Sequence, residues 1–212
     1  VRKLQNSALS QSIEIIRRRI DETGVREPTI QRQGDDRVIV QLPGIDDPER
    51  MKELIGKTAR LTFHLVDHSA TDEDIRNRNI SPGTKLLPLE RDSSESDNSQ
   101  PSLEMIAVRK RAELSGESLE DAQATFQDNQ PVVSFRFDTA GGRKFGKITK
   151  ENVNKSFAIV LDGKVISAPN INEPILGGSG IISGNFSVQS ADELAILLRA
   201  GALPAPMKVL EE

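Results

Sequence analysis

Residues 156–171, SFAIVLDGKVISAPNI, constrain the fold more than any other stretch of the chain. FAIVL is an unbroken apolar run, and its β-branched and aromatic content is typical of a buried strand. Asp162 and Gly163 have the chemistry of a tight turn, VIS continues as a returning strand, and Pro169 ends it. The sequence therefore predicts a β-hairpin that forms the rigid centre of a domain.

The composition limits the classes of protein to which the chain can belong. Its 212 residues suffice for one large domain or two small ones, with 36% apolar residues, 28% charged residues and a net charge of −4. Such a surface has no basic excess for nucleic acid, and seven Phe with no Tyr or Trp offer few rings on which bases could stack. We therefore expect no nucleic-acid partner.

Neither a membrane span nor a thiol is encoded in the chain. No apolar run exceeds five residues, whereas a spanning helix needs about 20, and the start VRKLQNSALSQ lacks the apolar core of a signal peptide. The absence of cysteine excludes disulfides, thiolate metal sites and a cysteine nucleophile. We expect a soluble chain, and any membrane anchor of its parent protein would lie outside it.

The N-terminal part reads as helix, strand, strand, helix. Apolar residues at spacings of four, three and four predict one face of a helix that ends at Gly24: Leu9, Ile13, Ile16 and Ile20. Residues 17–19 are three arginines, which we interpret as a solvated basic flank in preference to a site for an anionic ligand. A hairpin around residues 34–36 follows, and then a helix capped by Asp46 or Asp47.

The next element, residues 59–67, alternates in a way that predicts a strand with one buried face. Its apolar residues would point inward and the intervening ones, among them His64, outward. The order of elements is that of a ferredoxin-like βαββαβ unit without its first strand. The extended segment 204–212 is expected to return to this sheet and cover its open edge.

The rest of the chain reads as a second α+β subdomain. Residues 67–100 are polar and rich in turn residues, and predict a long mobile loop. After a strand within residues 103–114, the spacing of Leu119, Ala122 and Phe126 predicts a helix capped near Ser118. The subdomain is completed by a strand at 131–138, a glycine turn into a short helix at 139–148, the hairpin, two strands around Gly177, Gly178 and Gly180, and a helix capped by Ser190.

The predicted fold class is α+β, with a ferredoxin-like base subdomain and an α+β head subdomain inserted into it. We place the base at residues 1–67 and 201–212 and the head at residues 68–200, of which 68–100 would be largely flexible loop. Two chain crossings provide two hinges. We place these at Asp67, His68 and Ser69, and at Ala200, Gly201, Ala202 and Leu203.

No group of residues predicts an enzyme, a cofactor or a metal site. His64 and His68 lie near Asp67, but residues four apart at the end of a strand do not share a face as they would on a helix. The glycines at 141–142 and 177–180 lack the motif of a phosphate-binding loop and predict tight turns. The acidic residues between 72 and 97 lie in the polar loop, which cannot supply the dry, shaped site that a catalytic pair needs.

Several motifs together resemble the SecD family of protein-translocase subunits. The C-terminal half contributes FAIVLDGKVISAPNINEPILGGSGIISGNF and SADELAILLRAGALPAPMKVLEE, and the first half contributes IEIIRRRIDETGVREPTIQRQGDDRVIVQLPGI. A further stretch, VVSFRFDTAGGRKF, resembles the strand and turn of the family that contain the pattern Asp-x-x-Gly. The resemblance spans nearly the whole chain apart from residues 67–100, and the motifs are specific as a set, whereas LDG or GGSG alone would mean little.

The resemblance implies a periplasmic domain of a bacterial inner-membrane protein, situated between its first two membrane helices. Its partners would be SecF, the SecYEG translocon and an unfolded secretory polypeptide. The head would move relative to the base to promote export driven by the proton-motive force. The family's proton-carrying residues belong to membrane helices and none can be placed here. The family's first strand and the flanking membrane spans are missing, which indicates an excised soluble piece with an incomplete base sheet.

A glycine-rich stretch is the candidate for binding an unfolded chain, which offers free backbone groups and apolar side chains to a sheet edge or cleft. The candidate residues are Ile175, Leu176, Gly177, Gly178 and Ile181, because the glycines would let another backbone approach closely. The alternative is that the apolar side chains fill the core of the head and the glycines form turns. A static module that only docks the translocase subunits is the competing function, and a periplasmic hydrolase is a distant third.

Overall fold

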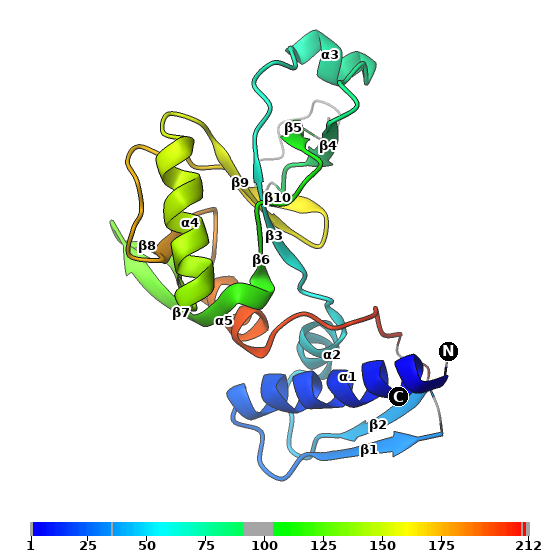
Figure 1. The fold of residues 1–212 in the computed structure, drawn as a ribbon. Coiled ribbons are helices and arrows are strands. Elements are labelled where there is room, and N and C mark those ends of the chain that lie inside the picture. Colours follow the sequence, from blue (N-terminus) through cyan, green and yellow to red (C-terminus); the bar gives the residue numbers. More distant parts are fainter. Residues whose placement is uncertain (1, 35, 91–103, 209, 211–212) are drawn as a thin grey trace, which may run out of the picture. The chain divides into compact units, whose positions relative to one another are not determined.

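The computed structural model describes residues 2–34, 36–90, 104–208 and 210. By its internal contacts the chain divides into two compact units. Unit 1 comprises Val1–Ala59 and Ile196–Glu212, and unit 2 comprises Arg60–Ala195. Helices and strands are mixed along the chain, in several small sheets, which confirms the predicted α+β class (Figure 1).

Unit 1 contains the predicted helices and hairpin of the N-terminal part. Its elements are helix α1 (Arg2–Glu22), strands β1 (Thr29–Gln33) and β2 (Arg37–Gln41), helix α2 (Pro48–Gly56) and the end of helix α5 (Val188–Ala200). The two strands pair antiparallel. Asp47 caps α2, because its carboxylate accepts a hydrogen bond from the Arg50 N–H at 3.0 Å. Local sequence signals thus suffice for these elements.

Strand β3 (Leu61–Leu65) does not join the sheet of unit 1, contrary to the prediction. It pairs with β9 (Phe157–Leu161) and β6 (Leu114–Ser115) in the four-stranded sheet β10-β9-β3-β6 of unit 2. The described residues that follow α5 form no strand either, so the expected return of the C-terminal segment is wrong for its described part. The chain consequently divides at 59/60 and 195/196 instead of 67/68 and 200/201.

Burial on both faces accounts for the central place of β3. Phe63 on one face is 0% exposed, and His64 on the other is 2% exposed, although we expected it to face solvent. Nδ1 of His64 lies 2.8 Å from the Arg109 carbonyl oxygen, and Nε2 lies 3.1 Å from Oγ1 of Thr62. Because both ring nitrogens have partners inside the protein, the ring can be buried.

The described residues of unit 2 form three sheets. β10 (Lys164–Ser167) completes the first, β11 (Ser179–Ile182), β8 (Gln130–Phe137) and β7 (Leu119–Gln127) form the second in that order, and β4 (Thr84–Pro88) and β5 (Met105–Arg109) form the third. The predicted β9–β10 hairpin is confirmed, and its turn residues Asp162 and Gly163 have φ of 48° and 83°.

Aromatic rings fill the core of unit 2. Their centroids lie 5.2–6.2 Å apart, mostly in tilted or edge-to-face pairs. Such geometry is favourable for aromatic rings beyond the area that they bury. The rings come from β3, β8, β9 and helix α4 (Thr139–Glu151), and they are Phe63, Phe135, Phe137, Phe145 and Phe157.

The region expected to be a flexible loop is largely folded where the structure describes it. Helix α3 (Asp72–Asn77) begins with a capping box, in which Thr71 and Asp74 each bond the backbone N–H of the other. Strand β4 follows and pairs along its whole length with β5. Residues 91–100 of the expected loop lie outside the described residues.

Residues 119–127 form strand β7, so the predicted helix is wrong. Leu119, Ala122 and Phe126 recur at helical spacing, but Phe126 is 62% exposed and does not belong to a buried face. Asp128 and Asn129 have φ of 49° and 66°, which fits the two-residue turn of a hairpin. Pairing with β8 along the strand therefore overrides the local helical pattern.

The strands within residues 172–186 and the cap of helix α5 differ from the prediction. Residues 172–186 contain one strand, β11, where we expected two. Ser190 does not precede helix α5 but lies in its first turn, where its Oγ accepts a hydrogen bond from the Ser187 N–H at 2.9 Å. Ser187 Oγ accepts in return from the Ser190 N–H at 3.0 Å. A serine pair thus caps this helix.

Candidate functional site

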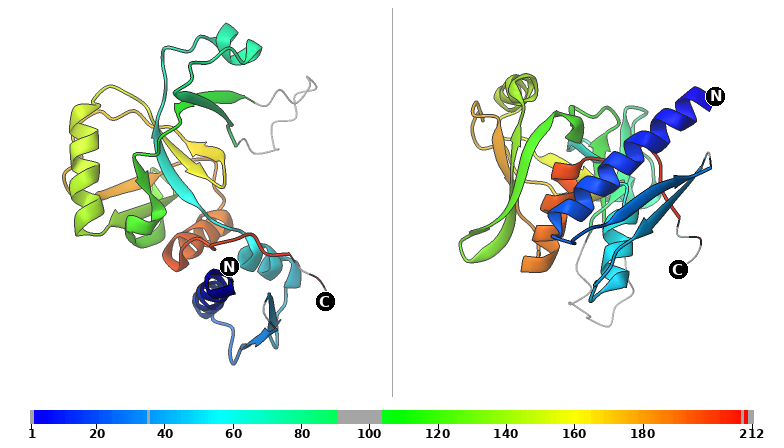
Figure 2. Two further views of the ribbon diagram at one scale, coloured as in Figure 1. Left: turned by 45° about the vertical axis from the view of Figure 1, so that its right-hand side comes forward. Right: turned by 90° about the horizontal axis from the view of Figure 1, so that it is seen from below.

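The candidate chain-binding residues lie together in unit 2. Residues 175–182, which we call the β11 segment, run as a loop into strand β11, drawn in orange in Figure 2. β11 is an edge of the sheet β11-β8-β7, with Ser179 opposite Arg136 and Ile182 opposite Val133. The segment therefore combines a surface loop with a strand edge.

Glycines of helix α4 hold the loop of the β11 segment close to the helix. A Cβ at Gly146 would lie 3.4 Å from Cδ2 of Leu176, and one at Gly142 would lie 3.3 Å from Cα of Gly178. Gly142 and its neighbour Gly141 lie within α4, so the turns predicted for them are wrong. Gly178 has φ of 68°, and here the prediction of a glycine turn is confirmed.

Thr149 anchors the same loop and was missed by sequence reasoning. Its side chain is fully buried and accepts a hydrogen bond from the Ile175 N–H at 2.9 Å, while its hydroxyl donates to the Phe145 carbonyl at 2.9 Å. The signal in the sequence is the spacing of four and three between Gly142, Gly146 and Thr149. Small residues at this spacing place one narrow face of a helix against another backbone.

The apolar side chains of the β11 segment divide between core and surface. Ile182 is fully buried and Ile175 is half-buried, whereas Leu176 is 75% exposed and Ile181 is 42% exposed. Leu176 and Ile181 therefore do not fill the core of the head, which was the alternative that the sequence left open. Gly177 is exposed between them. The segment presents two apolar side chains and an edge strand to its surroundings.

The first expected hinge, Asp67 to Ser69, lies within unit 2. Ser69 Oγ donates to Oδ1 of Asp67 at 2.6 Å, and the Thr84 hydroxyl donates to Oδ2. These bonds lower the pKa of Asp67 to about 2, and the bond from the Ser69 hydroxyl has the largest effect. His68 between them is exposed.

The second expected hinge, Ala200 to Leu203, lies within unit 1, where Ala200 ends α5. Gly201 has φ of 90°, and Ala202 is half-buried. The Leu203 N–H donates to the Thr58 carbonyl at 2.8 Å. Motion at either place stays a prediction.

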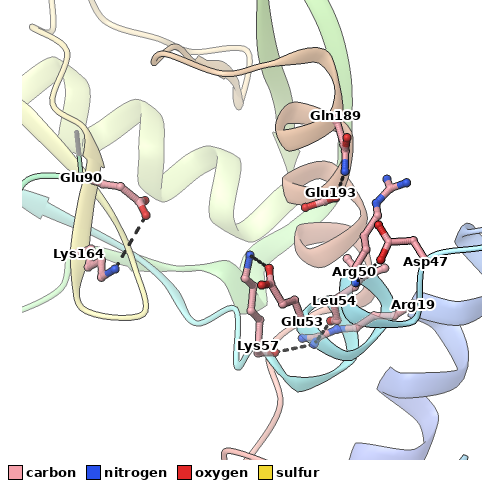
Figure 3. A network of polar contacts seen from close by, with 10 residues as sticks. All are labelled: Arg19, Asp47, Arg50, Glu53, Leu54, Lys57, Glu90, Lys164, Gln189 and Glu193. Carbon is pink, nitrogen blue, oxygen red and sulfur yellow. Dashed lines mark hydrogen bonds and ion pairs between the residues drawn. The ribbon is translucent and has the colours of Figure 1, made fainter. Parts of the chain in front are cut away.

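Arg19 is not part of a solvated flank, as the sequence suggested. It is 0% exposed, and its Nη1 donates to the carbonyls of Leu54 at 2.8 Å and Ile55 at 3.0 Å, and to that of Lys57 (Figure 3). Its Nη2 donates to the Gly201 carbonyl at 3.1 Å. The last carbonyls of a helix have no hydrogen-bond donors within the helix. At the end of α2, the Arg19 guanidinium donates the missing hydrogen bonds.

No metal site is formed by the histidines. His64 is buried in the sheet and His68 is exposed. Across the described ranges, no group of three or more His, Cys, Asp or Glu side chains is placed to hold a metal ion. The described part also contains no helix that is long and apolar enough to cross a membrane.

Two family models match the chain. That of the P1 head subdomain of SecDF matches residues 88–205, and that of the N-terminal part of the P1 domain of protein translocase subunit SecDF matches residues 9–68. Protein translocase subunit SecD of Rickettsia bellii is 49% identical over 211 residues, as is that of Magnetococcus marinus. The matches cover 99% of this chain but 39% and 40% of those proteins.

Solved structures of SecDF have a similar fold. A crystal structure in the super-membrane-facing form has a TM-score of 0.77 at 37% identity, over 97% of this chain and 28% of that chain. A second, of SecDF as a membrane component that enhances protein export, has a TM-score of 0.75 at 37% identity. It covers 98% of this chain and 93% of its own, so the two chains have nearly the same extent.

Proposed function

Because this chain belongs to the SecDF family and spans its P1 domain, we propose that it holds an unfolded polypeptide during protein export. In this proposal the domain lies on the periplasmic side of the bacterial inner membrane, in a subunit that works with SecF and the SecYEG translocon. The similarity to a membrane component that enhances protein export supports it. Movement of the head relative to the base, coupled to the proton-motive force, is part of the same proposal.

The observation that carries the proposal is the exposed apolar pair of the β11 segment. Leu176 is 75% exposed and Ile181 is 42% exposed. Residues 174–191 contain no charged side chain, in a chain of which 28% is charged. Exposed apolar side chains on an uncharged stretch favour contact with another apolar surface. An exported chain that has not yet folded provides such a surface at each stretch where its apolar side chains are exposed.

Aspartate substitutions test the proposal. We expect Leu176→Asp and Ile181→Asp each to weaken the binding of an unfolded secretory protein by about tenfold, because a contact that buries a leucine or isoleucine is worth about 1.5–3 kcal/mol. Binding is measured by fluorescence anisotropy of the labelled unfolded protein, after circular dichroism has shown that the variants fold.

Phe126→Asp is the matched control. Phe126 is 62% exposed on β7, at the opposite edge of the same sheet, and its loss should leave the affinity unchanged. Unaltered binding by folded Leu176→Asp and Ile181→Asp chains would exclude the β11 segment as the site.

A further inference from the structure

We propose that strand β11 takes up the held polypeptide as an additional strand of the sheet β11-β8-β7. The inference rests on the proposed function, and it adds the mode of recognition and the chemistry of the segment that is recognised. Backbone hydrogen bonds along β11 would provide affinity without a sequence requirement, as in other proteins that bind extended peptides at a sheet edge. Three features of the described residues support it.

The first feature is the direction of the backbone groups on β11. The Phe137 N–H donates to the Gly178 carbonyl at 2.9 Å, which fixes residue 178 as a hydrogen-bonded partner of β8. In an antiparallel ladder such pairs alternate, so Gly180 and Ile182 also direct their groups toward β8. Ser179 and Ile181 therefore direct their N–H and C=O groups away from the sheet, toward the open edge.

The second feature is that nothing in the described part closes this edge. β11 has one neighbour, β8, and within the described ranges no backbone hydrogen bond joins Ser179 or Ile181 to another segment. Both residues are exposed. An unpaired donor and acceptor on each of two alternate residues match the spacing of an incoming strand.

The third feature is the absence of the devices that normally protect an edge strand. Charged residues, proline, bulges and covering segments prevent unwanted pairing. β11 has a regular register with β8 from Ser179 to Ile182, and it contains neither a charge nor a proline. A strand with these properties is open to pairing.

Three other sheet edges in unit 2, β7, β10 and β6, have such devices. β7 carries Glu120 and Asp121, and its register shifts between Leu119 and Asp121. β10 has a register shift after Val165, whose carbonyl accepts a hydrogen bond from the Glu90 N–H at 2.9 Å. β6 is two residues long. The contrast within one unit singles out β11 as the edge left open for a ligand.

The occupant is an extended, uncharged segment of an unfolded polypeptide. The edge lies within residues 174–191, which carry no charge, and exposed apolar side chains lie on it at Ile181 and just before it at Leu176. A charged segment would lose solvation on binding, and residues 174–191 offer no charged side chain of their own to compensate for it. We therefore expect the site to prefer apolar, β-prone stretches of the exported chain over charged ones.

The test uses a short synthetic peptide of alternating valine and threonine with one tryptophan, added to the 212-residue chain. The chain has no Trp or Tyr, so tryptophan fluorescence reports on the peptide alone. A second peptide of the same sequence is N-methylated at alternate residues on its pairing side, which removes its donors but keeps its side chains. We expect the N-methylated peptide to bind more weakly by about fivefold or more, the effect of a lost hydrogen bond.

Variants of Ile181 probe the same bonds from the protein side. Ile181→Pro removes the outward N–H at a place where an edge strand tolerates proline, and it should weaken binding of the unmethylated peptide. Ile181→Val keeps the N–H and should bind as the parent chain does. If Ile181→Pro does not fold, the pair of peptides tests the same hydrogen bonds on the unaltered chain.

Amide hydrogen exchange gives a signature that side-chain contacts alone would not produce. On addition of the peptide, the amides of Ser179 and Ile181 should become protected, while Gly180 and Ile182 are protected already through β8. Equal binding of both peptides, with Leu176→Asp still weakening it, would overturn strand addition and leave the proposed function intact. If neither the peptides nor an unfolded protein bind, the proposed function itself fails.

A second copy of the chain is the other possible occupant of an open edge. Sedimentation of the parent chain should show a monomer. Dimers that are dispersed by Ile181→Pro would show that β11 pairs with itself, and they would overturn the proposal.

Discussion

His64 lies inside unit 2, on the central strand β3, and its environment makes it sensitive to pH. Burial lowers its pKa below the ordinary value of 6.5, and the positive charge of Lys85, whose Nζ is 3.5 Å from Nε2, acts in the same direction. The hydrogen bond to the Arg109 carbonyl opposes them. The folded chain therefore favours the neutral ring more than the unfolded chain does.

The sign of the pH effect follows from this difference. Below about pH 6.5 the unfolded chain binds a proton at His64 that the folded chain resists, so the free energy of unfolding should fall as the pH is lowered. We expect His64→Gln to reduce the loss of stability between about pH 7.5 and about pH 5.5 in urea unfolding. His68→Gln, at an exposed histidine, is the control and should leave it unchanged. An equal loss in both variants would contradict this role for His64.

Gly180 is a second residue whose contacts allow a prediction. A Cβ at this position would lie 2.5 Å from Cζ of Phe135, the residue opposite it on β8. Gly180→Ala should therefore destabilise the chain by about 1–3 kcal/mol through overpacking. Thermal unfolding measures this, with Gly177→Ala as the control, because a Cβ there meets nothing within 4 Å. Similar melting temperatures for the two variants would show that the Phe135 ring moves aside freely.

At the scale of elements, Arg19 joins α1 to the end of α2 and to the segment after α5. It donates to carbonyls of residues 54, 55 and 57 and to that of Gly201, all within unit 1. We expect Arg19→Met to lower the free energy of unfolding by about 1–3 kcal/mol, because the carbonyls around this buried side chain lose their donor. Urea unfolding of Arg17→Met, at an exposed position of the same run, is the control. Equal stability of the two variants would contradict the anchoring role.

Elements also show how far the sequence alone could lead. The helix of Leu9 to Ile20 and the Asp47-Pro48 start of α2 depend on neighbours in sequence, and they were predicted correctly. β3 was predicted as a strand, but its partner β9 lies far along the chain, so a local pattern could not assign it to the correct sheet. β7 pairs with the next strand, β8, and this pairing overrides the helical spacing of its apolar residues. Arg19 follows Ile16 by three positions, which places it on the buried face of α1, but its carbonyl partners are distant in sequence.

Dependence on distant parts of the chain also explains why only part of the candidate site could be predicted. The glycines and apolar residues of the β11 segment are recognisable as a set in the sequence, whereas their exposure depends on the fold. Thr149 lies 26 residues before Ile175, and nothing local to the loop indicates that they bond. The free edge of β11 follows only from the order of strands in its sheet.

At the scale of the whole molecule, the chain passes between its two units twice, at 59/60 and at 195/196. The proposed moving head and the static docking module differ in one observable, which is whether the distance between the units changes. Because the chain has no cysteine, Asp36→Cys in unit 1 and Gln127→Cys in unit 2 can be labelled for single-molecule energy transfer. For a moving head we expect two populations whose ratio shifts by several-fold when an unfolded secretory protein is added, because a ligand shifts an equilibrium between states that it binds unequally. One population that does not respond would favour the static module.

The way in which the β11 loop is held has a consequence for how the protein can change in evolution. Thr149 binds the backbone of residue 175, Gly142 packs against the backbone of Gly178, and Gly146 lies close to the backbone of residues 175 and 176 and to Cδ2 of Leu176, so most of the contacts that hold the loop are made to its backbone. That side chain is 75% exposed. A substitution at position 176 should therefore cost less folding stability than one in the core, and under the proposed function this position is where the preference for exported chains can change while the residues that hold the loop stay the same.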